Sequence, residues 1–170
     1  METKIITELT RDNLPLVAHA LRHGDVVAIP TETVYGLGAN GLDADAMDKI
    51  YAAKGRPSDN PLILHVPNAE SIKPLVKEIP ETAKALIEAF WPGPLTITLP
   101  KSDFVPDRAT GGLARVALRC PDHAVCRNIL ELAGVPIAAP SANISGRPSP
   151  TTAQSVYDDM NGRIPYIVDA

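Results

Sequence analysis

Short apolar runs alternate along the chain with longer segments in which apolar residues recur every three or four positions. The longer segments predict amphipathic helices, and the short runs predict buried strands. The expected helices cover about 12–23, a segment beginning at 43, 81–90, 123–133 and a segment through 153–160. The expected strands cover 26–29, 62–66, 95–99, 116–119, 137–139 and a run starting at 167. This alternation predicts an α/β fold, a single domain with a twisted mixed sheet and flanking helices.

Composition excludes several classes of protein. The 170 residues are 45% hydrophobic and carry a net charge of −4, which argues against a disordered chain and against a general nucleic-acid coat. The amino terminus lacks a signal-peptide core and no segment has the length of a membrane span, so we expect a cytoplasmic location and no membrane contact. Cys120 and Cys126 do not form a metal-ligand pattern, and helical spacing favours a core position for Cys126. We therefore expect no bound structural metal.

A basic run follows the helix that begins at residue 43. Lys54 occupies the position where the apolar stripe of that helix would continue, and Arg56 and Asn60 follow in a loop stiffened by prolines. Fixed cations beside an amide donor suit a polyphosphate, although the spacing differs from that of a P-loop. The alternative interpretation is a basic helix end that balances the helix dipole.

A second polar segment, PSANISGRPSPTT, follows the expected strand 137–139. Ser141, Asn143 and Ser149 supply hydroxyl and amide groups just before the last helix, where phosphate or ribose can bind. A polar turn with a helix cap explains the same residues without a ligand.

Three further residues are candidates for binding a small substrate. Arg119 ends a strand and can form two parallel hydrogen bonds with a carboxylate, or a salt bridge at the rim. His65 lies in a buried strand and is either a ligand or a core histidine, and Thr33 is either a ligand or an ordinary strand residue. Because ligands gather at the carboxyl ends of strands in open α/β sheets, we expect the segments PTETVYGLGAN, AKGRPSDNPLILHV and APSANISGRPSPTT to face one cleft, each as irregular backbone after a strand.

Five motifs occur in order: PTETVYGLGAN, KGRPSDNPLILHV, FWPGPLTITL, VALRCP and PSANISGRPSPT. In this set the chain resembles the YrdC-type threonylcarbamoyl-AMP synthases over nearly its whole length. The resemblance implies a YrdC-like domain over 1–170 with a large concave cleft. It also implies the synthesis of L-threonylcarbamoyladenylate and pyrophosphate from L-threonine, bicarbonate or CO2, and ATP. The product would feed the machinery that transfers threonylcarbamoyl to tRNA.

The resemblance also implies roles for individual residues. The implied ATP site comprises Lys54, Arg56, Asn60, Ser141, Asn143 and Ser149, and the implied threonine site comprises Thr33, His65 and Arg119. Lys54 and Arg56 would act in catalysis by stabilising charge on the phosphates, and Mg²⁺ would arrive with ATP rather than on protein ligands. No enzyme nucleophile is implied, in agreement with the lack of a recognisable nucleophile motif.

Relatives of this type continue beyond the segment IPYIVDA, so we expect the chain to lack the carboxyl-terminal end of the domain and to leave the strand that starts at Ile167 at an unpaired sheet edge. Two alternative functions remain open. One is a carbamoyl-adenylate-forming domain on the same fold. The other is an RNA-binding module, for which the candidate basic residues are Lys54, Arg56, Arg115, Arg119 and Arg147.

Overall fold

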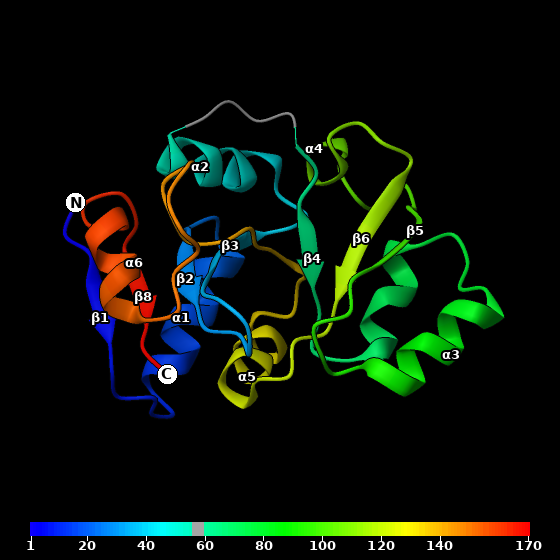
Figure 1. The fold of residues 1–170 in the computed structure, drawn as a ribbon, viewed down its shortest axis with the longest axis horizontal. Coiled ribbons are helices and arrows are strands. Elements are labelled where there is room, and N and C mark those ends of the chain that lie inside the picture. Colours follow the sequence, from blue (N-terminus) through cyan, green and yellow to red (C-terminus); the bar gives the residue numbers. More distant parts are fainter. Residues whose placement is uncertain (56–59) are drawn as a thin grey trace.

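The computed structural model describes residues 1–55 and 60–170, and within these residues eight strands form one mixed sheet (Figure 1). The strands lie in the order β1-β8-β2-β3-β7-β4-β6-β5. Their bounds are β1 Lys4–Ile6, β2 Val27–Ile29, β3 Gly36–Asn40, β4 Ile63–His65, β5 Ile97–Pro100, β6 Arg115–Arg119, β7 Ile137–Ala138 and β8 Tyr166–Val168. The pairs β1–β8, β8–β2 and β4–β6 are parallel, and the other neighbours are antiparallel. The α/β fold with a mixed sheet is confirmed.

Helices cover both faces of the sheet. Their bounds are α1 Asn13–Arg22, α2 Ala44–Lys54, the 3₁₀ helix η1 Ala69–Leu75, α3 Glu81–Phe90, α4 Asp107–Thr110, α5 Ala124–Ala133 and α6 Ala153–Met160. Helices α1 and α5 pack together on one face, over side chains such as Val27 and Ile29 of β2. The other helices pack on the opposite face over a larger core that includes Ala28 of the same strand. Alternate residues of one strand therefore serve two cores.

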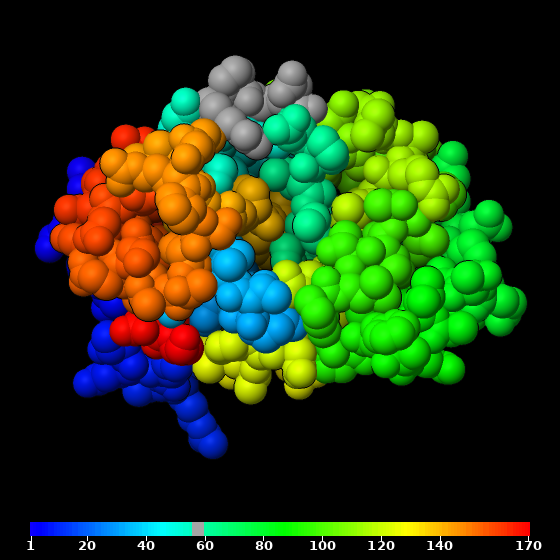
Figure 2. Space-filling model, viewed as in Figure 1, coloured from blue at the N-terminus to red at the C-terminus, as the bar shows by residue number. Residues whose placement is uncertain are grey.

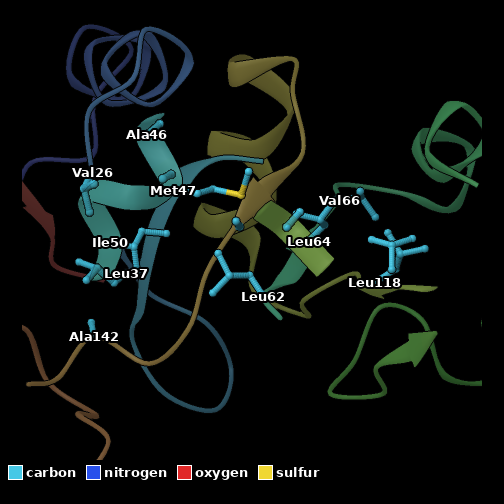
Figure 3. Packing of buried hydrophobic residues seen from close by; sticks show 14 of the residues in the cluster. Val26, Leu37, Ala46, Met47, Ile50, Leu62, Leu64, Val66, Leu118 and Ala142 are labelled. Carbon is cyan, nitrogen blue, oxygen red and sulfur yellow. The ribbon is translucent and has the colours of Figure 1, made fainter. Parts of the chain in front are cut away.

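The larger core brings α2 onto the centre of the sheet (Figure 3). Met47 and Ile50 of α2 are fully buried, as are Leu37, Leu64 and Leu118 of the strands. Asp43 caps the helix by accepting hydrogen bonds from the backbone N–H groups of residues 45 and 46, which agrees with the predicted start. The cap and the apolar stripe together place the carboxyl end of α2 beside the polar loops.

The expectation that PTETVYGLGAN is entirely irregular is wrong for its second half. Gly36–Asn40 form β3, every residue of which is buried. At the adjoining Gly41, an added Cβ would lie 2.7 Å from Cδ2 of Leu64 and 3.0 Å from the carbonyl oxygen of Pro136. Small residues are therefore needed where β3 passes the neighbouring strands. Because glycine is uncommon inside strands, the sequence of β3 does not look like that of a strand.

The expected unpaired edge at the end of the chain is also wrong. Strand β8 lies between β1 and β2, with Ile167 opposite both Ile5 and Ala28. Within the described residues the edge strands of the sheet are instead β1 and β5. The pairing of β8 joins segments from the two ends of the chain, as Figure 1 shows.

None of the helices in residues 1–55 and 60–170 is both long and apolar enough to span a membrane.

Candidate functional site

Two of the predicted site residues lie side by side at the ends of parallel strands. His65 of β4 and Arg119 of β6 are Cα partners in the sheet register. Both residues are buried, with 3% and 9% of their surface exposed. Parallel strands in register place equivalent side chains on the same face, so the imidazole of His65 and the guanidinium of Arg119 lie on the same face of the sheet.

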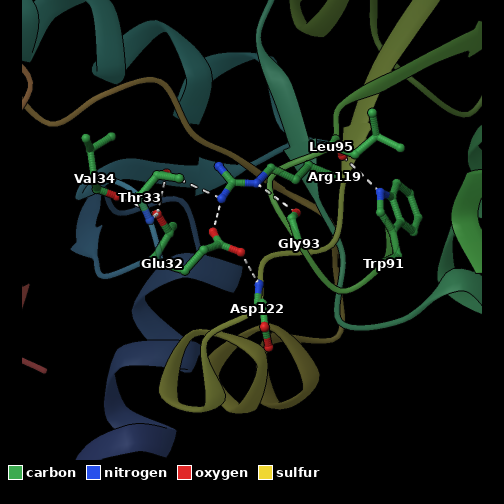
Figure 4. A network of polar contacts seen from close by, with 9 residues as sticks. Glu32, Thr33, Val34, Trp91, Gly93, Leu95, Arg119 and Asp122 are labelled. Atoms are coloured by element: carbon green, nitrogen blue, oxygen red, sulfur yellow. Dashed lines mark hydrogen bonds and ion pairs between the residues drawn. The ribbon is translucent and has the colours of Figure 1, made fainter. Parts of the chain in front are cut away.

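The guanidinium of Arg119 is held from three sides (Figure 4). Its Nε donates to the carbonyl oxygen of Gly93 at 3.3 Å, and its Nη2 donates to Oγ1 of Thr33 at 3.4 Å. Nη2 also forms an ion pair and hydrogen bond with Oε1 of Glu32. Among the described residues no acceptor contacts Nη1. Thr33 and Arg119 thus lie together, and the ion pair joins the buried Arg119 to the partly exposed Glu32.

Glu32 is a residue of this cluster that the sequence analysis did not single out. Its second oxygen, Oε2, accepts the backbone N–H of Asp122 at 2.5 Å, so one carboxylate links the loop after β2 to the segment before α5. Thr31 shapes that loop by donating to the carbonyl of Val34 and accepting the backbone N–H of Thr33. An acidic side chain beside Thr33 was the available signal, but its partner lies 87 positions away in the sequence.

His65 is a neutral imidazole at physiological pH. Burial lowers its pKa to about 4, although the carbonyls of Ile63 and Ile137 oppose this effect. Nδ1 lies 3.1 Å from the carbonyl oxygen of Ile63, which fits a tautomer with the proton on Nδ1. The ring therefore adds polarity to the site without adding charge.

Lys54 forms the connection between α2 and the loop after β7. Only 4% of the residue is exposed, and its Nζ donates to the carbonyl oxygens of Ser141 at 2.5 Å and Asn143 at 2.9 Å. Its own carbonyl accepts the backbone N–H of Ser145. Gly55 ends the helix in the left-handed region at φ 73°. The lysine thus points inward, as its place on the helical stripe predicted.

The other residues predicted to bind ATP occupy three environments. Asn143 is buried, and its Nδ2 donates to the carbonyls of Ile144 and Arg147, while its Oδ1 has no partner in the described part of the chain. Ser149 is exposed and lines a 300 Å³ pocket that also contains Arg147 and Asp159. Asn60 is exposed, and its carbonyl accepts the hydroxyl of Tyr51.

Arg56 lies outside the described residues.

The surface is hollowed between the loop that follows β2 and the loop that follows β7 (Figure 2). A cavity of 510 Å³ lies elsewhere, between the end of β4, η1 and the end of α5. Its lining includes Val66, Leu75, Phe104 and Leu130 but none of the predicted site residues.

The meeting of the predicted segments does not follow from parallel strand ends alone. Strands β4 and β6 are parallel and fit that expectation. Strand β7, which precedes Ser141, is antiparallel to β4, and β3, which follows Thr33, is antiparallel to both β2 and β7. Other contacts join the segments: the backbone N–H of Ala142 donates to the carbonyl of Tyr35, and Lys54 of α2 donates to the carbonyls of Ser141 and Asn143.

Comparison with known proteins places this arrangement in a family. The Sua5/YciO/YrdC family model, described as "Telomere recombination", matches residues 19–170. The chain belongs to the Sua5/YciO/YrdC family. Among curated members, the threonylcarbamoyl-AMP synthase of Pyrococcus abyssi is 56% identical over 91% of this chain and 45% of its own length. The one from Bacillus subtilis is 52% identical over 96% of this chain and 49% of its own length.

This chain therefore spans about half the length of these two Sua5/YciO/YrdC relatives. A threonylcarbamoyl-AMP synthase of Vibrio cholerae is shorter. It is 36% identical over 93% of this chain, which covers 85% of that relative.

Solved structures of the Sua5/YciO/YrdC family share the fold. The crystal structure of P. abyssi Sua5 complexed with L-threonine matches with a TM-score of 0.95 and 52% identity over 99% of this chain and 50% of that chain. Escherichia coli YciO matches with a TM-score of 0.86 at 19% identity over 98% of this chain and 83% of that chain, which supports the fold alone.

Proposed function

We propose that the protein is an L-threonylcarbamoyladenylate synthase, which joins L-threonine, bicarbonate or CO2, and ATP and releases pyrophosphate. The observation that carries this proposal is the buried Arg119, which lies beside Thr33 and the neutral His65 and whose Nη1 has no acceptor among the described residues. The names of the relatives support the same reaction. The V. cholerae relative adds weight because most of its length corresponds to this chain.

Threonine binds at Arg119 in this proposal. The carboxylate of the amino acid meets a fixed guanidinium, and charge-assisted hydrogen bonds of this kind are stronger than neutral ones. Thr33 and His65 offer polar groups for the rest of the substrate. The neutral state of His65 suits a hydroxyl partner, because an imidazole without charge does not attract a second anion to the site.

ATP binds, in this proposal, along the loop that Lys54 organises. The lysine holds the carbonyls of Ser141 and Asn143 and brings positive charge beneath the loop. Asn60, Ser149 and Arg56 complete the proposed contacts with the nucleotide. The described residues place no three His, Cys, Asp or Glu side chains together at a possible metal site, and we propose that Mg²⁺ enters bound to the triphosphate as part of the substrate.

Catalysis then depends on positioning and on charge stabilisation. The bound threonine ammonium first releases a proton to solvent. The free amine then bonds to the carbon of CO2 with loss of a second proton, or to the carbon of bicarbonate with loss of water, and the resulting carbamate oxygen attacks the α-phosphate of ATP. The new bond is the mixed anhydride, and pyrophosphate leaves with the electron pair of the broken phosphoanhydride bond. Lys54 and Arg56 stabilise charge on the phosphates in this proposal.

Release of pyrophosphate with and without L-threonine tests the proposed function. We expect release from ATP and bicarbonate to require threonine, and Arg56→Ala to lower the rate about 100-fold, as removal of one preorganised donor does elsewhere. Carbamoyl phosphate replaces threonine and bicarbonate in a parallel assay. Threonine-independent release, or release that only carbamoyl phosphate supports, would contradict the proposal.

The product belongs upstream of the transfer of a threonylcarbamoyl group to tRNA, and we propose a cytoplasmic partner machinery for that step. Direct RNA binding by this chain has less support. Two of the candidate basic residues are paired with acids, Arg119 with Glu32 and Arg147 with Asp159. RNA binding that depends on salt and that ATP does not displace would favour this alternative.

A further inference from the structure

The proposed reaction assigns no role to the carboxylate of Glu32, although this group lies in the threonine site. Both of its oxygens accept hydrogen bonds, one from Arg119 and the other from the backbone N–H of Asp122. The Glu32 side chain is 21% exposed and the Arg119 side chain is 11% exposed. The ion pair is therefore mostly shielded from water by the protein, but part of its surface faces solvent, where a ligand can reach it.

The pair of side chains has no net charge. An anionic ligand at Nη1 of Arg119 would also lie near the carboxylate of Glu32, because Glu32 contacts Nη2 of the same guanidinium (Figure 4). Like charges at such separations repel in a partly buried site. A ligand that carries only a carboxylate is thus attracted by Arg119 and repelled by Glu32.

A zwitterion does not meet this conflict. A carboxylate provides about four lone-pair positions, and the contacts of Glu32 with Arg119 and Asp122 use two of them, so its oxygens can still accept an ammonium group. An α-amino acid carries its ammonium next to its carboxylate, which matches a carboxylate next to a guanidinium.

We propose that Glu32 is a specificity-determining residue that receives the ammonium group of the amino-acid substrate while Arg119 receives its carboxylate. The inference rests on the proposed function, because it assumes that threonine binds at Arg119. The ion pair selects α-amino acids in their zwitterionic form over hydroxy acids and other plain carboxylates.

A purely structural role for Glu32 has different consequences. If Glu32 only held Arg119 and the segment before α5 in place, its loss would weaken all ligands of Arg119 by the same factor. Recognition of the ammonium group instead predicts a loss that depends on whether the ligand carries an amine. The ratio of the affinity for a ligand with the amine to the affinity for a ligand without it distinguishes the two roles.

The native protein provides the first measurement. Calorimetric titration compares L-threonine with 3-hydroxybutanoate, which lacks the amine, and with 1-aminopropan-2-ol, which lacks the carboxylate. We expect each analogue to bind at least about tenfold more weakly than threonine, the loss typical of one charge-assisted hydrogen bond. A plain carboxylate that binds as well as threonine would overturn the inference without any variant.

The variant Glu32→Gln provides the second measurement. It removes the charge at nearly constant volume, and we expect threonine to lose about tenfold or more in affinity while 3-hydroxybutanoate loses nothing or gains. The matched control is Asp122→Asn, which removes a neighbouring negative charge but keeps the backbone N–H that contacts Glu32. The control should retain the native ratio, and ATP affinity should be unchanged in both proteins.

The outcomes distinguish this inference from the proposed function. A native ratio in Glu32→Gln, or the same change of ratio in Asp122→Asn, would overturn the role of Glu32 and leave the synthase proposal intact. Failure of the native protein to bind threonine at all would overturn both.

Discussion

At the scale of single residues, the site is defined by two ionisable side chains that burial affects differently. Arg119 keeps its charge in a mostly buried position because Glu32 neutralises it and Gly93 accepts its Nε. His65 loses its charge because no acid compensates for its burial among the described residues. The charged guanidinium of Arg119 and the neutral imidazole of His65 therefore lie at paired positions on neighbouring strands.

Replacement of Arg119 by Lys tests the need for the planar guanidinium. Lysine keeps the charge but cannot contact Gly93, Glu32 and Thr33 while it also offers a separate nitrogen to a ligand. We expect threonine affinity to fall at least about tenfold and ATP affinity to change little. Calorimetry with both ligands measures this. Arg115→Lys is the control, because Arg115 lies on the same strand with an exposed side chain. Equal losses for both ligands would contradict the assignment.

The buried His65 predicts a dependence of stability on pH. Its pKa is about 4 in the folded chain and about 6.5 when exposed, so the unfolded state binds more protons between these values. Stability is therefore fully present above pH 6.5 and is lost as the pH falls toward 4. Between pH 7 and pH 5 we expect His65 to account for a loss of about 2 kcal/mol.

Urea denaturation at the two pH values measures this loss in the native protein and in His65→Gln. The variant should show a smaller difference between pH 7 and pH 5, with a remainder that includes His123, whose pKa burial also lowers. His19→Gln on the exposed side of α1 is the matched control for a histidine-to-glutamine change outside the core. Identical pH dependence in native protein and His65→Gln would show that the imidazole is not shielded as described.

At the scale of secondary-structure elements, the important connection is the one between α2 and the loop after β7. The helix ends at Lys54, whose ammonium reaches carbonyls at positions 141 and 143, and Gly55 then turns the chain away. The helix also sits on the core through Met47 and Ile50, so the ammonium has a rigid support. The loop that carries the predicted nucleotide contacts is therefore positioned by the last residue of a helix.

Replacement of Lys54 by Met tests this connection. Methionine keeps an unbranched apolar chain but leaves the carbonyls of Ser141 and Asn143 without their donor. We expect a loss of stability of about 2–3 kcal/mol, since buried polar groups that lose a partner are costly. Urea denaturation measures the loss, and ATP titration should show weaker binding.

The control on the same helix is Lys49→Met. Lys49 is exposed, and within the described part of the chain its ammonium donates to the carbonyl of Gly24 alone, so we expect a loss below about 1 kcal/mol. Equal stability of the two variants would show that the buried ammonium does not hold the loop.

At the scale of the whole molecule, the two ends of the chain are joined in the sheet. Strand β8 fills the position between β1 and β2, and its residues Ile167 and Val168 contribute to the cores on opposite faces. The last strand is therefore an internal part of the fold. Its pairing also anchors β2, after which the loop with Glu32 and Thr33 begins.

Truncation of Ile167 to Ala tests this role. The side chain is fully buried, and the lost contacts and the cavity left behind should reduce the free energy of unfolding by about 2–5 kcal/mol. Leu132→Ala on α5 is the control, because that leucine is 45% exposed, and we expect a change within about 0.5 kcal/mol. Denaturant titration compares the two. An equally small change for Ile167→Ala would contradict the internal position of β8.

The sequence by itself predicted the features that depend on near neighbours. Helix α3 has the predicted bounds, and α5 begins after His123, which accepts the N–H of Cys126. Cys126 is fully buried, as its helical spacing indicated. Periodicity and caps act over one or two turns, so a single segment contains all the information they need. The order of the motifs likewise placed the chain in its family, because it is a property of the sequence alone.

Only the tertiary structure decided which distant segments meet. Strand β3 is identified by its pairing with β2 and β7, and its own glycine-rich sequence does not predict a strand. The internal position of β8 depends on β1, which lies at the other end of the chain. The ion pair between Glu32 and Arg119 depends on the strand order, which brings together two residues 87 positions apart in the sequence. A local sequence pattern determines whether a segment forms a helix or a strand. Which strands pair with one another depends on the apolar surface that several segments bury together.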